Sequence, residues 1–242
     1  MGKIYAIGTG PGDPGCMTLE AHAVLAKCNV VVGYKLYLDM LGDLLEGKTL
    51  IPGAMYGEVE RCRAAIDSAQ AGNTVAVVSS GDAGVYGMAG LLLELMSEMD
   101  CIIDFEVIPG VTAVLAAAAR LGAPLMCDFT VLSLSDLLMP REVILKRAAA
   151  AASADMVTAL YNPASTRRGE LFKEVLELFE RHGGDLIVAV ADNIARENER
   201  CRVYRLSEVP AGEVGMGSLV IIGNSQTRVV NGKMYAKRGY FK

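Results

Sequence analysis

Short apolar runs alternate with longer segments of helical spacing along the first half of the chain. The predicted strands are nearly continuous in apolar residues and cover residues 4–8, 30–32, 74–78 and 105–108. The predicted helices lie between and after them, at residues 18–26, 34–45, 58–71, 87–96 and 111–121. This alternation is typical of a buried parallel sheet with helices on both faces.

The pattern restarts after Gly122-Ala123-Pro124, where a helix must end because proline cannot continue it. Further strands are predicted at residues 130–133, 156–161 and 186–190, with helices at 141–151 and 168–181. Two β-rich runs, 202–206 and 218–223, indicate antiparallel strands. We therefore expect an α/β protein with two α/β/α domains, residues 1–121 and 122–242.

Composition narrows the class of protein. The chain has 242 residues, a net charge of −5, 52% hydrophobic residues and no tryptophan. An acidic chain provides no general basic field for nucleic acid, and no apolar run reaches the length of a membrane span. A strand begins at once near the N-terminus, without a charged-then-apolar leader, so we expect a cytoplasmic protein.

The cysteines do not form a metal-binding pattern. None of the six belongs to a C-x-x-C motif, and the chain has only two histidines. We expect no metal site and interpret the cysteines as reduced thiols in a reducing compartment.

The loop Gly8-Thr9-Gly10-Pro11-Gly12-Asp13 follows the first strand directly. Glycine permits a positive φ and a close approach of the backbone to a ligand. The spacing differs from the dinucleotide motif G-x-G-x-x-G, and no acidic residue closes the second strand. A P-loop is excluded because no Gly-Lys-Ser/Thr occurs. The loop is either a structural turn or a ligand loop.

A second glycine-rich segment, residues 79–90, follows an apolar strand and is expected at the carboxyl edge of the sheet, where ligands bind in open α/β folds. Its glycines expose backbone groups, and Asp82 adds one carboxylate. This combination suits an ammonium, a sulfonium or ribose hydroxyls better than a diphosphate. The alternative is a structural turn in which Asp82 caps the following helix.

Two more strand ends carry polar residues. In Pro109-Gly110-Val111-Thr112-Ala113, Thr112 either caps the next helix or faces a ligand beside the free N–H groups of the first turn. Tyr161-Asn162-Pro163 ends a strand of the second half, although asparagine before proline is also typical of a simple turn. Strand-end loops from both halves predict a ligand cleft between two domains.

These motifs, in this order, resemble those of the tetrapyrrole (corrin/porphyrin) methylase family. That family has the class III methyltransferase fold, pairs two α/β domains around a cleft and uses S-adenosylmethionine. Within it, the chain is similar to the members that methylate carbon 17 of precorrin-3B or cobalt-precorrin-3 in cobalamin biosynthesis. The stretches that carry this closer similarity are residues 33–37, 58–62, 79–90, 121–129, 133–138 and 220–227. The resemblance spans essentially the whole chain and implies methyl transfer to carbon 17 with contraction of the macrocycle.

The resemblance also implies the site residues. Contacts with S-adenosylmethionine would come from Pro11, Ser80, Gly81, Asp82, Val85, Thr112, Ala113, Tyr161 and Asn162. The first glycine loop lies beside the tetrapyrrole and the methyl donor in the family, which assigns Gly10 and Gly12 to the substrate. The first domain would thus face the tetrapyrrole, and the second would share the cofactor side. Members of the family tend to be homodimers, so we expect a homodimer.

Two segments depart from the family pattern. Residues 191–196 stand where relatives usually have a more basic run, which puts a contact there in doubt, and residues 54–57 replace a commoner Gly-Met-Thr type of sequence. The chain also lacks the cysteine-rich extension of some relatives, so an iron–sulfur cluster is not expected.

Methyl transfer from a sulfonium depends mainly on positioning, so no activated nucleophile is expected. Asp13 is the candidate catalytic residue, through proton transfer or electrostatic stabilisation as the macrocycle rearranges, and it is equally suited to cap the next helix. Lys35, Arg61 and Arg141 are candidates for holding the carboxylates on the rim of the substrate, although each also fits an ordinary surface charge.

Three alternatives stay open. The acceptor could be another precorrin carbon or a modified protein side chain. The chain could instead be a non-catalytic nucleotide-binding module with structural glycine loops. For the favoured substrate, the sequence does not separate a metal-free from a cobalt-loaded tetrapyrrole.

Overall fold

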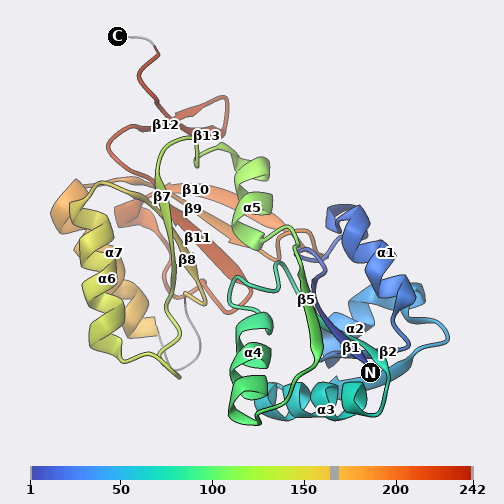
Figure 1. Ribbon diagram of the computed structural model, residues 1–242. Coiled ribbons are helices and arrows are strands. Elements are labelled where there is room, and N and C mark those ends of the chain that lie inside the picture. Colours follow the sequence, from blue (N-terminus) through green and yellow to red (C-terminus); the bar gives the residue numbers. More distant parts are fainter. Residues whose placement is uncertain (1, 164–168, 241–242) are drawn as a thin grey trace. The chain divides into compact units, whose positions relative to one another are not determined.

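The computed structural model describes residues 2–163 and 169–240. The chain forms two compact units, Met1–Ala113 and Val114–Lys242 (Figure 1). Each unit contains its own sheet and its own helices. The division falls after Ala113, the first residue of helix α5 (Ala113–Leu121), whereas the sequence pattern places the boundary after the last residue of this helix.

Helix α5 forms a hydrogen bond and an ion pair with other residues of the second unit. The Val114 N–H donates to Tyr161 Oη at 3.0 Å, and Arg120 forms an ion pair with Glu199 at 3.0 Å. The short strand β6 (Gly122–Ala123) then pairs with strand β13 (Lys233–Ala236). These partners come from far along the sequence, so the local pattern around Gly122 could not show them.

The first unit is built on a five-stranded sheet of order β3-β2-β4-β1-β5, in which every pair of neighbours is parallel. The strands are β1 (Lys3–Gly8), β2 (Val30–Tyr34), β3 (Thr49–Gly53), β4 (Thr74–Ser79) and β5 (Asp104–Ile108). The predicted parallel sheet is confirmed. Strand β3 was not predicted, because it is an edge strand with mostly exposed side chains and a proline at its fourth position.

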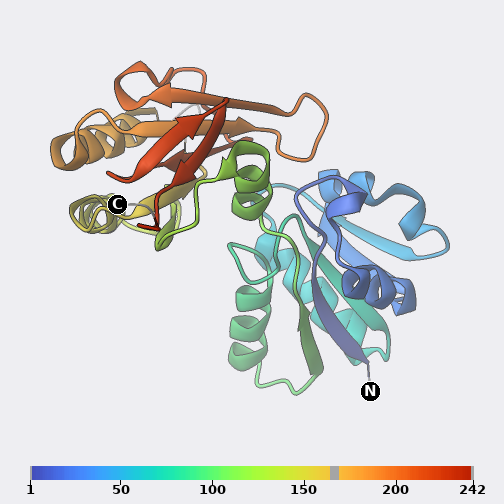
Figure 2. The same ribbon diagram turned by 90° about the horizontal axis from the view of Figure 1, so that it is seen from above.

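Helices cover both faces of this sheet (Figures 1 and 2). Ile4 and Ala6 of β1 pack on one side with residues of α3 and α4, whereas Ile7 packs on the other with residues of α1 and α2. This alternation follows from the two-residue period of a strand. The helices are α1 (Leu19–Lys27), α2 (Lys35–Leu41), α3 (Glu58–Gln70) and α4 (Ala89–Glu98).

The single helix predicted for residues 34–45 is divided into two. Helix α2 ends at Leu41, and a 3-10 helix, η2 (Gly42–Leu45), follows. Gly42 adopts a φ of 48°, a conformation that glycine tolerates and that interrupts an α-helix.

The second unit contains a mixed sheet of order β10-β9-β11-β8-β7. Its strands are β7 (Phe129–Ser133), β8 (Val157–Tyr161), β9 (Ile187–Asp192), β10 (Arg200–Arg205) and β11 (Ser218–Ile222). β7 and β8 are parallel, while β10 and β11 pair antiparallel with their neighbours, as the two β-rich runs indicated. Because β11 is antiparallel to both β8 and β9, the strands β7, β8 and β9 all end at the same edge.

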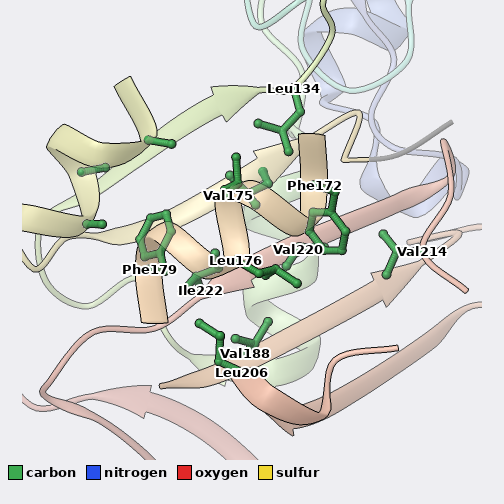
Figure 3. Close-up of a cluster of buried hydrophobic side chains, with 14 of the residues drawn as sticks. Leu134, Phe172, Val175, Leu176, Phe179, Val188, Leu206, Val214, Val220 and Ile222 are labelled. Carbon is green, nitrogen blue, oxygen red and sulfur yellow. The ribbon is translucent and has the colours of Figure 1, made fainter. Parts of the chain in front are cut away.

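Two helices, α6 (Arg141–Ser153) and α7 (Gly169–Gly183), pack on this mixed sheet. Figure 3 shows Phe172, Val175, Leu176 and Phe179 of α7 pointing toward strand residues such as Val220. The helical residues recur at i, i+3, i+4 and i+7, which places them on one face. A small sheet of β12 (Thr227–Val230), β13 and β6 completes the unit and was not predicted.

The helices within residues 2–163 and 169–240 are too short or too polar to cross a lipid bilayer.

Candidate functional site

Three strand ends meet at the carboxyl edge of the first sheet. β4, β1 and β5 are neighbours, and the loops that follow them are residues 80–88, 9–13 and 109–112. The first two loops form a short antiparallel bridge, in which the Gly10 N–H donates to Gly81 O at 3.0 Å and the Gly81 N–H donates to Gly10 O at 2.7 Å. The glycine loops are therefore one connected structure.

Glycine is required where these backbones touch. A Cβ on Gly8 would lie 2.6 Å from the Gly110 nitrogen, and a Cβ on Gly110 would overlap the Gly81 carbonyl oxygen. Gly10 and Gly81 also adopt φ values of 78° and 79°. The sequence interpretation connected these glycines with the approach of a ligand. The structure shows that these glycines allow the backbones of the loops to lie in close contact with one another.

Most of the predicted cofactor residues of the first unit lie beside one another at this edge. The Ser80 hydroxyl is 3.5 Å from the Pro11 carbonyl oxygen. A Cβ on Gly81 would be in ordinary contact with Thr112 and Ala113, at 3.7 Å from the Thr112 Cα and 3.8 Å from the Ala113 nitrogen. Their role in binding the cofactor stays a prediction.

The Asp82 carboxylate joins two of the loops. Its Oδ1 accepts from the N–H groups of Gly84 at 2.8 Å and Val85 at 3.1 Å, and its Oδ2 accepts from the Gly110 N–H at 2.9 Å. It does not cap α4, whose preceding residue Met88 donates its N–H to Ser79 Oγ at 3.1 Å. A carboxylate offers about four acceptor positions. Asp82 therefore anchors the loops and retains the capacity for one further contact.

Asp13, the candidate catalytic residue, lies on the exposed side of the first loop. It is the N-cap of the 3-10 helix η1 (Pro14–Cys16), and its Oδ1 accepts from the Gly15 N–H at 2.7 Å. The capping role considered from the sequence is thus present. A catalytic role stays a prediction.

A small pocket lies beside the first glycine loop. One wall contains Gly10 and Gly12, the predicted substrate-side residues, together with Ser80. The remaining lining residues are Thr9, Pro14, Met17, Tyr37, Met40, Leu41 and Leu44. All of them belong to the first unit.

The three basic candidates are each paired with an acidic side chain. Lys35 is 2.9 Å from Asp39 one turn further along α2, and Arg141 is 2.5 Å from Glu174. Arg61 is only 7% exposed, and its guanidinium donates to Glu58 and to the Ala54 carbonyl oxygen. This arrangement favours a structural role for Arg61 in holding the loop before α3. A role of the three residues in substrate binding stays a prediction without support from their geometry.

In the second unit, Tyr161 and Asn162 lie at the edge where β7, β8 and β9 end. The Tyr161 hydroxyl accepts from the Val114 N–H in the first turn of α5. Asn162 adopts a φ of 50° and donates its Nδ2 to Ser133 Oγ at 3.1 Å. A ligand cleft formed by this edge and the first unit stays a prediction.

Two serines that organise these edges were missed in the sequence. Ser79 accepts from the N–H that precedes α4, and Ser133 holds the side chain of Asn162. Both are the last residue of an otherwise largely apolar strand, which is the signal that could have identified them.

The described residues contain no group of three or more His, Cys, Asp or Glu side chains that could hold a metal ion. The six cysteines are free. Burial raises the pKa of the Cys28 thiol to about 11 and that of Cys62 to about 12, so both are un-ionised near neutral pH.

The fold, with its glycine loops at one strand edge, is that of a known family. The chain belongs to the tetrapyrrole (corrin/porphyrin) methylases, whose family model matches residues 3–210.

Curated relatives cover almost the whole chain. The "Probable cobalt-factor III C(17)-methyltransferase" of Salmonella typhimurium is 46% identical over 238 residues, which are 98% of this chain and 99% of that protein. The "Cobalamin biosynthesis protein CbiHC" of Archaeoglobus fulgidus is 42% identical over 239 residues. That match covers 99% of this chain but 53% of the relative, so the chain spans about half the length of the Archaeoglobus protein.

Solved structures agree with the family. The crystal structure of the methyltransferase CobJ has a TM-score of 0.93 at 35% identity, covering 98% of this chain and 100% of that one. The uroporphyrin-III C-methyltransferase of Thermus thermophilus, complexed with S-adenosylhomocysteine, has a TM-score of 0.71 at 26% identity. It covers 91% of this chain and 97% of its own.

Proposed function

We propose that this chain transfers a methyl group from S-adenosylmethionine to carbon 17 of cobalt-factor III, with contraction of the macrocycle, in cobalamin biosynthesis. The observation that supports this substrate is the Salmonella relative, which carries the activity in its name and matches this chain over almost the full length of both proteins. We further propose that the protein acts as a homodimer in the cytoplasm.

The chemistry of the first unit's edge fits the methyl donor. Residues 8–13, 79–90 and 109–113 contain two carboxylates, Asp13 and Asp82, and no lysine, arginine or histidine. S-adenosylmethionine carries a sulfonium and an ammonium, and both are favoured near carboxylates and backbone carbonyl oxygens. A phosphate-bearing cofactor would need the opposite charge.

S-adenosylmethionine would supply a methyl group that is already activated by the positive sulfur. The residues of this chain would therefore act by position. Asp82 holds the loop of residues 82–85 against Gly110, and the bridge between Gly10 and Gly81 fixes the two glycine loops relative to each other. A rigid edge that holds donor and acceptor in line lowers the entropic part of the barrier.

The decisive experiment is an anaerobic incubation of the purified protein with S-adenosylmethionine and cobalt-factor III. We expect a mass gain of one methyl group in the tetrapyrrole and a change in its absorbance as the macrocycle contracts. Omitting the donor gives the control. Absence of methylation, when the protein binds the donor, would refute the proposed substrate.

Two further measurements separate the alternatives. Parallel incubation with metal-free precorrin-3B shows whether the cobalt-loaded form is preferred, and analysis of the methylated position identifies the acceptor carbon. Calorimetric titration with S-adenosylhomocysteine tests the donor site itself. A protein that binds no S-adenosylhomocysteine at millimolar concentration is not a methyltransferase of this kind.

A further inference from the structure

The loop between β4 and α4, residues 80–88, has a backbone conformation that is unfavourable by itself. Tyr86 adopts a φ of 53°, in the left-handed region that an aromatic residue rarely occupies. Gly87 packs against the backbone of the same loop, because a Cβ there would lie 2.4 Å from the Ala83 carbonyl oxygen. Such a conformation persists only where the surrounding contacts enforce it. The loop must therefore be held at both of its ends.

Asp82 holds the first end of the loop, as described above, and Ser79 holds the second. Ser79 is the last residue of β4, is 4% exposed, and accepts the Met88 N–H on its Oγ at 3.1 Å. Because Met88 directly precedes α4, this hydrogen bond joins the end of the strand to the start of the helix. The Ala89 N–H, which donates to Ala83 O at 3.0 Å, closes the same loop one residue further on.

The Ser79 side chain serves this closure alone. Four other buried hydroxyl side chains each donate to an oxygen atom of the protein: Thr9, Thr158, Ser218 and Thr227. Within residues 2–163 and 169–240, Ser79 Oγ has no hydrogen-bond partner other than the Met88 N–H. Loss of the Ser79 hydroxyl would therefore remove one identifiable contact and leave the N–H of Met88, which is 9% exposed, without its acceptor.

The loop carries four of the residues that are expected to contact the methyl donor, namely Ser80, Gly81, Asp82 and Val85. A ligand binds more tightly to a loop that already has its bound conformation, because no binding free energy is lost in ordering it. Without the bond from Ser79, Tyr86 can leave the left-handed region, and the donor must then bind the fraction of molecules in which the loop is closed. The apparent affinity falls in proportion to that fraction.

We propose that Ser79 is a positioning residue for the methyl donor, and that its hydroxyl oxygen keeps residues 80–88 closed before the donor binds. The inference rests on the proposed function, because it concerns the site to which S-adenosylmethionine is proposed to bind. Ser79 acts through the loop, so its loss should raise the Michaelis constant for the donor. At saturating donor the loop is closed in every molecule, and kcat should stay within about twofold of that of the wild type.

The test compares Ser79→Thr with Ser79→Val. The two new side chains have nearly the same shape and differ in the hydroxyl, so crowding by the added methyl group is common to both. We expect the dissociation constant of S-adenosylhomocysteine, measured by calorimetry, to be about tenfold higher in Ser79→Val than in Ser79→Thr. Ser79→Ala adds no atom and should show a similar loss of affinity relative to the wild type, so the test does not depend on space for a methyl group.

Thr227→Val is the matched control in the second unit. Thr227 is 2% exposed, and its Oγ1 accepts the Asn224 N–H at 2.9 Å, which is the same type of bond as that of Ser79. Its loss should lower the stability in urea by a similar amount and leave the dissociation constant of S-adenosylhomocysteine within about twofold. Hydrogen exchange adds a local measurement: the Met88 amide should exchange faster in Ser79→Val than in Ser79→Thr, and saturating S-adenosylhomocysteine should slow it again.

The outcomes distinguish this inference from the proposed function. Equal affinities of Ser79→Val and Ser79→Thr, or of Ser79→Ala and the wild type, overturn the inference alone when the wild type binds S-adenosylhomocysteine. A loss of affinity in Thr227→Val as large as that in Ser79→Val identifies general destabilisation as the cause and also overturns it. A wild type that binds no S-adenosylhomocysteine refutes the proposed function, and this inference with it.

Discussion

In the first unit, the loops at the carboxyl edge of the sheet touch backbone against backbone, with the Asp82 carboxylate as an added anchor, whereas in the second unit side-chain hydrogen bonds connect the corresponding edge. Gly8, Gly81 and Gly110 touch directly in the first case. In the second, Ser133 binds Asn162, and Ser218 donates to Asp192 Oδ1 at 2.5 Å. The glycines of the first unit have no side chains that would separate the loops, whereas the loops of the second unit meet through polar side chains.

The difference predicts how each edge responds to substitution. A backbone contact has no side chain that can move aside, so even one added methyl group must displace a loop. A side-chain contact can be removed at the cost of one hydrogen bond. The first unit should therefore be the more sensitive of the two, and the following tests are arranged from the largest expected effect to the smallest.

Gly110→Ala should have the largest effect. The new Cβ would overlap the Gly81 carbonyl oxygen and press on Gly8, and we expect the free energy of unfolding to fall by about 3 kcal/mol, with loss of S-adenosylhomocysteine binding. Denaturant unfolding and calorimetry measure the two effects. The matched control is Gly90→Ala in α4, where nothing lies within 4 Å of the added Cβ, and there stability should rise by about 0.5–1 kcal/mol. Equal effects of the two substitutions would contradict the packing argument.

Asp82→Asn comes next. The amide keeps one acceptor oxygen, so it can serve either the Gly84 and Val85 N–H groups or the Gly110 N–H, but not both sets. We expect a loss of about 2 kcal/mol in the free energy of unfolding, measured by urea titration. Asp13→Asn is the control, because asparagine is as good an N-cap as aspartate, and its loss should stay below about 0.5 kcal/mol. A smaller loss at Asp82 than at Asp13 would count against Asp82 as the anchor of the loops.

Tyr161→Phe tests the second unit. It leaves the N–H of Val114, a residue only 2% exposed, without its acceptor, at a cost of about 1–2 kcal/mol. Hydrogen exchange of the Val114 amide should accelerate, while exchange in β1 should not change. Tyr235→Phe is the control, since no hydrogen bond of the Tyr235 hydroxyl occurs among residues 2–163 and 169–240. Unchanged exchange at Val114 would show that another acceptor replaces the phenol.

The smallest effect concerns the buried thiols of the first unit. Because burial raises the pKa of Cys62 to about 12 and that of Cys28 to about 11, iodoacetamide at pH 8 should modify them far more slowly than the half-buried Cys127 of the second unit. Mass spectrometry of the digested protein gives the rates, and unfolding in urea should equalise them. Since the unfolded thiols ionise at lower pH than the folded ones, stability should decline as the pH rises from 9 toward 11–12. A stability that rises over this range would contradict the assignment.

Local pattern predicted most of the strands and helices, since apolar runs and helical spacing are properties of neighbouring residues. It failed for β3, whose exposed edge and Pro52 break the apolar run, and for β12 and β13, where Arg228 and Lys233 obscure the strand. The sequence identified the loop motifs, but it did not show which contacts their residues make with one another. That Gly10 pairs with Gly81, or that Asp82 binds Gly110, depends on contacts between segments far apart in the chain. The pocket wall at Tyr37 and Met40 was missed because an apolar row in a helix usually belongs to the core.

The contact between Gly8, Gly81 and Gly110 also restricts which substitutions this enzyme can accept during evolution. A crowded pair of ordinary side chains can be relieved by shrinking one partner when the other grows. Three glycines in contact leave nothing to shrink, so a substitution at one has no compensating change at the others. Differences between related chains must then arise in the side chains around this edge, because the glycines of the edge itself cannot change.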